Sequence, residues 1–251
     1  GKIPASPEMV ADYISRFAGH LAIATLQHRL IAIHRAHTDK GLTSPVSDKL
    51  VKRTMQGIRR TFGVSQRRVQ ALVKDDLLEI LVLVAKQKPL KAARDKAILL
   101  IGFAGAFRRS ELVALTVEDI TPHAHGIELL IRRSKTDQES EGRTVFVPLA
   151  KSQERCPVIA LRAWLELAEI GAGPLFRPVS RHDLLASAKA LTPQSVALVV
   201  KAAMKHAKGV DAASAVSAHS LRAGFVTEAA MVGMQPSVIM GQTGHKSLEM
   251  V

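Results

Sequence analysis

Apolar residues recur at every third or fourth position along the first quarter of the chain, a spacing that predicts amphipathic helices. The repeating stretches are Pro7 to Phe17, Leu21 to His37, Ser47 to Phe62 and Gln66 to Val73. Turn-forming residues separate them at 41–45 and 63–65. We therefore expect a first domain, residues 1–74, that is built from short helices.

The second part of the chain, residues 75–251, combines helical spacing with one short region of strict alternation. The segments 126–132 and 143–148 alternate apolar and polar residues, which predicts two strands of a hairpin. Helical spacing is found in Asp75 to Ala85, Ala92 to Ala106, Ser110 to Leu115, Val158 to Ile170, Pro193 to Ala207, Ser217 to Val232 and Pro236 to Met240. The predicted fold class is mainly α, with a small antiparallel β-sheet in the second domain.

The net charge of the chain indicates the kind of partner that it binds. The 251 residues carry a formal net charge of +13, with a pI near 10.2. The excess is concentrated in the first domain, where 13 basic residues face 4 acidic ones through Lys74. Such a balance favours a polyanion as partner, with nucleic acid the first candidate and an anionic membrane the second.

Three features speak against a membrane or an oxidising compartment. The longest apolar run, residues 97–107, is shorter than the roughly 20 residues of a spanning helix. No signal-peptide pattern opens the chain. Cys156 is the only cysteine, which excludes an internal disulfide. We expect a cytoplasmic protein.

Two arginines on separate elements are candidates for a phosphate clamp, since the planar guanidinium donates paired hydrogen bonds to phosphate oxygens. Arg108 follows an apolar helix, and Glu111 lies three residues later, close enough to orient it. In His219-Ser-Leu-Arg222 the histidine and the arginine share one helical face. Taken alone, each pair is more often a solvated ion pair or a structural histidine.

Two further residues complete the candidate set. Lys135 lies in the hairpin turn Ser134-Lys-Thr-Asp, from which a flexible ammonium group could protonate a leaving oxygen. His245 follows Thr243-Gly244, where glycine permits a close backbone approach. A solvated turn lysine and an ordinary helix-start loop are the alternative interpretations.

In their order and combination, the motifs FRRSEL, SKTDQ, HSLRAGF and TGHKSL resemble the tyrosine recombinase (phage integrase) family. Pro4 to Arg60 also resembles the core-binding domain of the Cre-like branch. The resemblance implies a two-lobed architecture, with a helical core-binding domain and an α/β catalytic domain. It further implies site-specific DNA recombination through a 3′-phosphotyrosyl intermediate, without a metal or another cofactor.

The same resemblance implies roles for the candidate residues. Arg108 and Arg222 would bind the scissile phosphate, and Lys135 would protonate the departing 5′ oxygen. His219 and His245 would hold phosphate oxygens and help to move protons. Glu111 would be the supporting carboxylate.

The family pattern puts the nucleophilic tyrosine on the helix after His245, beyond Val251. Tyr13 is the only tyrosine of the chain, and its neighbours Val10, Ile14 and Phe17 indicate a packed aromatic residue. We therefore expect these 251 residues to bind DNA without cleaving it. We also expect the first helices of the core-binding domain to be missing ahead of Pro4.

DNA contacts are expected mainly from the first domain. Base or phosphate contacts are assigned to the Leu21 helix and backbone contacts to a basic band, although a solvated helix face remains the alternative for each. The candidates are Thr25, His28 and Arg29 for the helix, and Arg59, Arg60, Arg67 and Arg68 for the band.

For the whole protein, the resemblance implies a homotetramer on inverted-repeat DNA, encoded by a bacterium or a phage, while these 251 residues alone would be monomeric. Two other functions remain open. One is a non-catalytic DNA-binding relative with the same fold, and the other is DNA relaxation like that of type IB topoisomerases.

Overall fold

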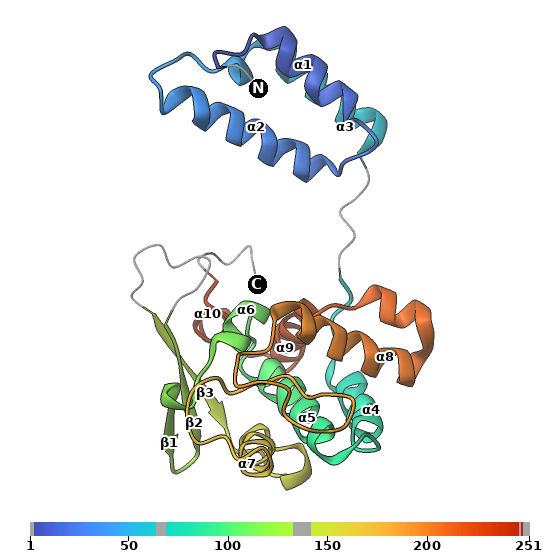
Figure 1. Ribbon diagram of the computed structural model, residues 1–251, viewed down its shortest axis with the longest axis vertical. Helices are drawn as coiled ribbons and strands as arrows, with labels where there is room; N and C mark the ends of the chain where they lie inside the picture. Colours follow the sequence, from blue (N-terminus) through green and yellow to red (C-terminus); the bar gives the residue numbers. More distant parts are fainter. Residues whose placement is uncertain (1–2, 64–68, 133–141, 246, 248–251) are drawn as a thin grey trace. The chain divides into compact units, whose positions relative to one another are not determined.

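The computed structural model describes residues 3–63, 69–132, 142–245 and 247, and the chain divides into two compact units, residues 1–67 and 68–251 (Figure 1). Each unit has a hydrophobic core of its own. The predicted fold class is confirmed, since the described residues form helices and one three-stranded antiparallel sheet.

Over residues 3–63, the first unit contains three α-helices: α1 (Pro7–Arg16), α2 (Ile23–Thr38) and α3 (Lys49–Phe62). A short 3-10 helix, Pro45–Ser47, precedes α3. Ser6 caps α1 by accepting the Met9 amide, and Asp48 caps α3 by accepting the Leu50 amide. The apolar stripes of the three helices form one core, which contains Val10, Ile14, Leu26, Leu30, Val51, Met55 and Ile58.

The helix predicted for Gln66 to Val73 is wrong over its described part. Residues 69–73 are not helical. The backbone N–H groups of Gln70 and Leu72 instead donate to the carbonyls of Ala215 and Ser220, both at 2.9 Å. Leu72 is fully buried in the core of the second unit. Tertiary partners thus replace the local hydrogen bonds that the apolar spacing suggested.

In the second unit, α5 (Pro89–Ala104) is the central helix. Ala97 to Ile101 are all buried, because other helices cover α5 on several sides. The surrounding helices are α4 (Lys74–Val84), α6 (Arg109–Ala114), α7 (Pro157–Leu167), α8 (Pro193–Ala215), α9 (His219–Met231) and α10 (Pro236–Thr243). Short 3-10 helices lie at Val117–Asp119 and Gln153–Arg155. Figure 1 shows α4 and α8 on the opposite side of α5 from the sheet.

The sheet has the order β1-β2-β3, with β1 at Ile120–His123, β2 at Gly126–Ile131 and β3 at Arg143–Pro148. All pairs are antiparallel, and Leu129 lies opposite Val145. The residues expected on one face, Ile127, Leu129, Ile131, Val145 and Val147, are all buried. The hairpin prediction is therefore confirmed. The sequence pattern missed β1, a four-residue edge strand that contains Pro122.

Helix α8 runs beyond its predicted end at Ala207. Gly209 interrupts it with a φ of 88° and a ψ of −177°, so the segment consists of two helical parts that meet at a kink. Helix α10 ends in a different way. Its C-cap Gly244 has the left-handed φ of 67°, which glycine adopts without steric cost, and this turn directs the chain to His245.

Candidate phosphate-binding site

The site is built around Glu111, a carboxylate that is 3% exposed at the start of α6. Ala106 adopts a left-handed φ of 48° where α5 ends, and the chain then enters α6 with Arg108 as its N-cap. Glu111 accepts the Arg108 backbone N–H at 3.0 Å and the Arg108 Nη1 at 2.7 Å. The carboxylate therefore holds both the backbone and the guanidinium of the same arginine.

Arg222 approaches this point from α9 and is only 2% exposed. Its Nη1 donates to the carbonyl of Ala106 at 2.9 Å and to the carbonyl of Thr243 at 2.5 Å. These two carbonyls lie two residues before Arg108 and two residues before His245. One guanidinium nitrogen thus joins α9 to the segments that carry the other candidate residues.

The second terminal nitrogen of Arg222, Nη2, is buried and has no hydrogen-bond partner in the described part of the chain. Leaving such a donor unpaired costs about 1–3 kcal/mol. Burial, followed by the charge of Arg108, lowers the pKa of Arg222 to about 10, so the group stays cationic at neutral pH. A buried cation with an unused donor is suited to an incoming anion.

Both candidate histidines are near these arginines. His219 begins α9, and partial desolvation together with the charges of Arg222 and Arg108 lowers its pKa. His245 is half-buried, and burial followed by the charges of Arg222, Arg108, His219 and Arg143 lowers its pKa to about 4. Both imidazoles are therefore neutral at pH 7 in the free protein. The structure brings together Arg108, Glu111, His219, Arg222 and His245.

Arg143 belongs to the same cluster and was not predicted. It starts β3, and its Nη2 donates to Glu111 Oε2 at 3.2 Å while its Nη1 donates to the carbonyl of Gln242 at 2.8 Å. Its burial lowers the pKa, and the neighbouring Arg108 lowers it further, whereas Glu111 raises it. One feature of the sequence indicated an inward-facing arginine. Side chains alternate along a strand, so Arg143 lies on the same face of β3 as the buried Val145 and Val147.

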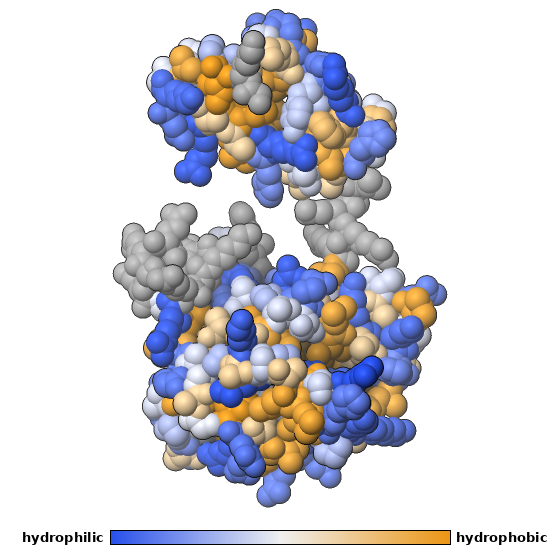
Figure 2. Space-filling view, viewed as in Figure 1, coloured by the Kyte–Doolittle hydropathy of each residue, from blue (hydrophilic) through white to orange (hydrophobic). Residues whose placement is uncertain are grey.

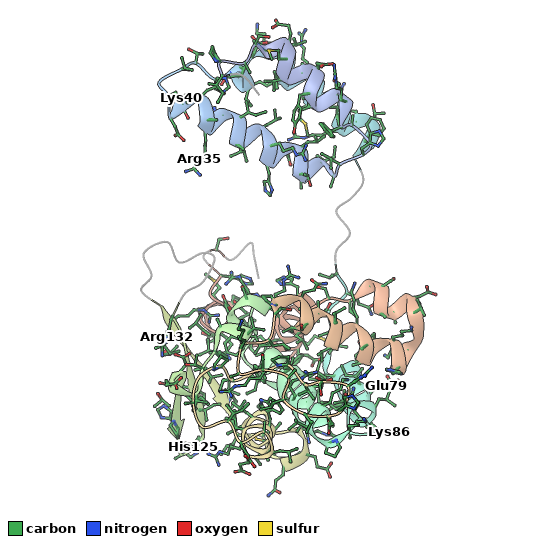
Figure 3. All side chains as sticks on the ribbon, in the orientation of Figure 1. Arg35, Lys40, Glu79, Lys86, His125 and Arg132 are labelled. Carbon is green, nitrogen blue, oxygen red and sulfur yellow. The ribbon has the colours of Figure 1, made fainter. Side chains whose placement is uncertain are left out.

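The predicted Lys135 lies outside the described residues, as do Arg67 and Arg68. The two ends of the segment that contains Lys135 are described. Arg132 follows β2 and its Nε lies 2.5 Å from Asp119 Oδ1, whereas Arg143 at the other end binds Glu111. Figure 3 shows Arg132 and His125 at opposite ends of the sheet.

The residues proposed for DNA contact in the first unit have different environments. His28, Arg59 and Arg60 are exposed, and Thr25 is half-buried. Arg29 donates from Nη1 to the Tyr13 hydroxyl at 2.6 Å, and its guanidinium lies 5.0 Å from the centre of the Phe17 ring. Tyr13 is therefore held by a neighbouring helix, in agreement with its interpretation as a packed aromatic residue.

An apolar cavity of about 490 Å³ lies between α1 and α2, where Figure 2 shows hydrophobic residues gathered. Its lining includes Met9, Val10, Tyr13, Ile33 and Ala36. Arg29 and His37 also line it, but Arg29 is bound to the Tyr13 hydroxyl and His37 to backbone groups of Ile33 and Ala5, so the cavity has little to offer a phosphate. Among the described residues there is no group of three or more His, Cys, Asp and Glu side chains that could hold a metal ion. Nor does any described helix have the length and apolar character needed to cross a membrane.

The described residues thus form a mainly helical unit with a small sheet, in which arginines and histidines from several elements gather around the buried carboxylate of Glu111. The chain belongs to the phage integrase family, the tyrosine recombinases, whose sequence profile it matches over residues 70–251. The family resemblance of the motifs is thereby confirmed. The likeness of the first unit to the Cre-like branch stays a prediction.

A curated relative supports this membership. The chain is 39% identical over 252 residues to the integrase/recombinase xerD homolog of Selenomonas ruminantium, and the match covers 99% of this chain and 73% of the relative.

Solved structures share the fold. XerH recombinase in a post-cleavage complex with palindromic difH DNA superposes with a TM-score of 0.69 at 21% identity, covering 98% of this chain and 67% of that one. A lambda integrase dimer bound to a COC′ core site superposes with a TM-score of 0.59 at 14% identity, covering 97% of this chain and 62% of that one. XerH in a pre-cleavage complex with difH superposes with a TM-score of 0.63 at 19% identity, covering 98% of this chain and 66% of that one. The chain therefore spans about two thirds of the length of these solved relatives.

Proposed function

We propose that this chain supplies the DNA-binding and phosphate-activating core of a site-specific DNA recombinase. The observation that carries the proposal is the cluster of Arg108 and Arg222 next to Glu111, with a buried Arg222 donor that lacks a partner in the described residues. A phosphodiester of DNA provides the missing acceptor. The relatives named above, the xerD homolog and XerH, are recombinases by their names, which supports this choice of substrate.

In the proposed reaction, Arg108 and Arg222 bind the non-bridging oxygens of the scissile phosphate and neutralise the charge that develops on them. A tyrosine hydroxyl passes its proton to a neighbouring histidine and attacks the phosphorus, the bond to the 5′ oxygen breaks, and Lys135 gives that oxygen a proton. His219 and His245 contact the phosphate oxygens. A 5′ hydroxyl of another strand then gives its proton to Lys135 and displaces the tyrosine, which takes its proton back from the histidine, and the phosphodiester is restored.

The first unit has the proposed role of holding the duplex. The exposed His28, Arg59 and Arg60 are available for DNA contact, whereas Arg29 would have to leave Tyr13 to reach it. We propose inverted-repeat sites as targets and a homotetramer as the acting form of the whole protein, in the cytoplasm of a bacterium or as a phage product. These 251 residues alone are expected to be monomeric.

The test uses nicked duplexes that trap the covalent intermediate. We expect this chain to bind DNA without forming an adduct, because Tyr13 is its only tyrosine. A version with the tyrosine that the family pattern puts after His245 should form the adduct. Replacing Arg222 by Gln should reduce adduct formation about 100-fold, the typical effect of removing one transition-state donor. Arg155→Gln, at an exposed site on the surface, is the matched control.

The products separate the alternatives. Exchange of strands between two duplexes supports a recombinase. Relaxation of supercoiled DNA without exchange products would identify an activity of the type IB topoisomerase kind. DNA binding without an adduct in the tyrosine-containing version would leave only the non-catalytic DNA-binding relative.

A further inference from the structure

Thr243, at the end of α10, contacts His245 through its side chain. The threonine is fully buried. Its Oγ1 lies 2.7 Å from the carbonyl oxygen of Ile239 and 3.1 Å from Nδ1 of His245. The carbonyl oxygen of Met240 is more distant, at 3.4 Å. The hydroxyl therefore has one close neighbour that only accepts hydrogen bonds, the Ile239 oxygen, and one imidazole nitrogen.

The single hydroxyl hydrogen decides which nitrogen of His245 is protonated. If the hydroxyl donated to Nδ1, two oxygens without an intervening hydrogen would lie 2.7 Å apart. The hydroxyl must therefore donate to the Ile239 carbonyl and accept from Nδ1–H. A neutral imidazole carries one hydrogen, so Nε2 keeps a lone pair and is the only nitrogen left for an incoming phosphate.

The surroundings keep this imidazole neutral. Three cations from three elements face it, Arg108 at the start of α6, Arg143 on β3 and Arg222 on α9, and the titratable His219 of α9 is a fourth neighbour. Burial is the largest cause of its lowered pKa, and these charges add to it. Glu111 is the acidic group of the same cluster, and it is already bound to Arg108 and Arg143.

We propose that Thr243 is a positioning residue that fixes His245 as the Nδ1–H tautomer, so that Nε2 must take up a proton from the solvent before it can donate to a bound phosphate. A neutral Nε2 accepts hydrogen bonds, as do phosphate oxygens, and the two would repel each other. Protonation turns Nε2 into a donor, while Nδ1–H remains on Thr243. Phosphate binding is thereby coupled to the uptake of one proton. The identity of the anion rests on the proposed function.

The tautomer is measured without any DNA. Long-range ¹H–¹⁵N spectra of the 251-residue chain, labelled at histidine, report the protonation of each ring nitrogen, and the spectrum of His245→Gln identifies the His245 signals. We expect a protonated Nδ1 and an unprotonated Nε2 at pH 7. Thr243→Val, which keeps the shape but removes the acceptor, should shift the population towards the Nε2–H form. Thr243→Ser should restore the Nδ1–H form.

Protonated Nε2 in the free wild-type protein would overturn the assignment. So would an unchanged tautomer in Thr243→Val. Circular dichroism and urea unfolding of both variants check that the fold persists, and a loss of stability without a tautomer change would identify a structural role only.

Proton uptake is measured with duplex DNA as the probe. At saturation, Nε2 of His245 should move to the protonated chemical shift. The affinity should fall about tenfold per pH unit between the free and the bound pKa of His245, because one proton is linked to binding. In the variant His245→Gln, this pH dependence of the affinity should be absent. A neutral Nε2 in the saturated complex would refute the coupling, whereas absence of DNA binding, seen by fluorescence anisotropy, would refute the proposed function and leave the tautomer result standing.

Discussion

Replacing Gly224 by alanine should loosen the attachment of residues 69–73 to α9. An added Cβ would lie 1.9 Å from the carbonyl oxygen of Leu72 and 2.6 Å from its carbonyl carbon. Backbone atoms cannot yield as a flexible side chain does, so the segment has to move away from the helix. Leu72 then loses its burial and the hydrogen bond from its amide to Ser220.

The size of the effect follows from these contacts. Exposing a buried leucine costs about 1.5–3 kcal/mol, and losing one hydrogen bond costs about 1 kcal/mol. Alanine returns about 1 kcal/mol through its higher helix propensity. The net expectation is a loss of about 1.5–3 kcal/mol in the free energy of unfolding of the second unit, well above the effect of typical surface substitutions.

Trp164 makes the measurement specific to the second unit. It is the only tryptophan, it is fully buried, and its indole N–H donates to the carbonyl of Leu175 at 2.7 Å. Its fluorescence during urea unfolding therefore reports this unit alone. Gly241→Ala is the matched control, because α10 contains this glycine and nothing lies within 4 Å of the added Cβ. The control should be stabilised by up to about 1 kcal/mol. Equal midpoints for the two variants would refute the reasoning.

Three further predictions concern charge. Glu111→Gln should lower the unfolding free energy of the second unit by about 3 kcal/mol, since two arginines lose a buried partner; Trp164 fluorescence measures this, with the exposed Glu154→Gln as control. The double replacement of Arg59 and Arg60 by Gln should reduce the slope of log affinity for DNA against log salt by about 2, measured by anisotropy, and an unchanged slope would exclude them from the phosphate contacts. The lowered pKa of His245, about 4, means that the unfolded chain binds its proton first as the pH falls. This residue therefore contributes stability above pH 6.5 that is lost towards pH 4, and urea unfolding should show a weaker pH dependence in His245→Gln.

The predictable part of the fold came from periodicity. Helices with one apolar face, such as α1 and α3, and the alternating strands β2 and β3 were found close to their observed ends. The prediction for residues 69–73 was wrong because Leu72 is buried by α9, which is distant in sequence. Strand β1 was not predicted, because four residues that include a proline are too few to show the alternation of apolar and polar positions typical of a strand.

The site divides in a similar way. Arg108 and Glu111 were predicted as a pair because their contact is local, three residues apart. The contacts of Arg222 with the carbonyls of Ala106 and Thr243 depend on tertiary structure, so only the motif order suggested this residue. Arg143 was missed because no motif contains it, although an arginine in register with buried valines was visible in the sequence.

Two arginine–carboxylate pairs lie at the ends of the connection between β2 and β3. They determine how much an insertion in that connection would affect stability. Arg132 is tied to Asp119, and Arg143 is tied to Glu111, so the entry and the exit of the connection are each fixed to the body of the unit. For a loop with anchored ends, doubling the length adds only about 0.6 kcal/mol of closure cost. Insertions between residues 133 and 141 should therefore be accepted with little loss of stability. Such insertions would separate stability from catalysis, because the proposed proton donor Lys135 lies between the same two ends.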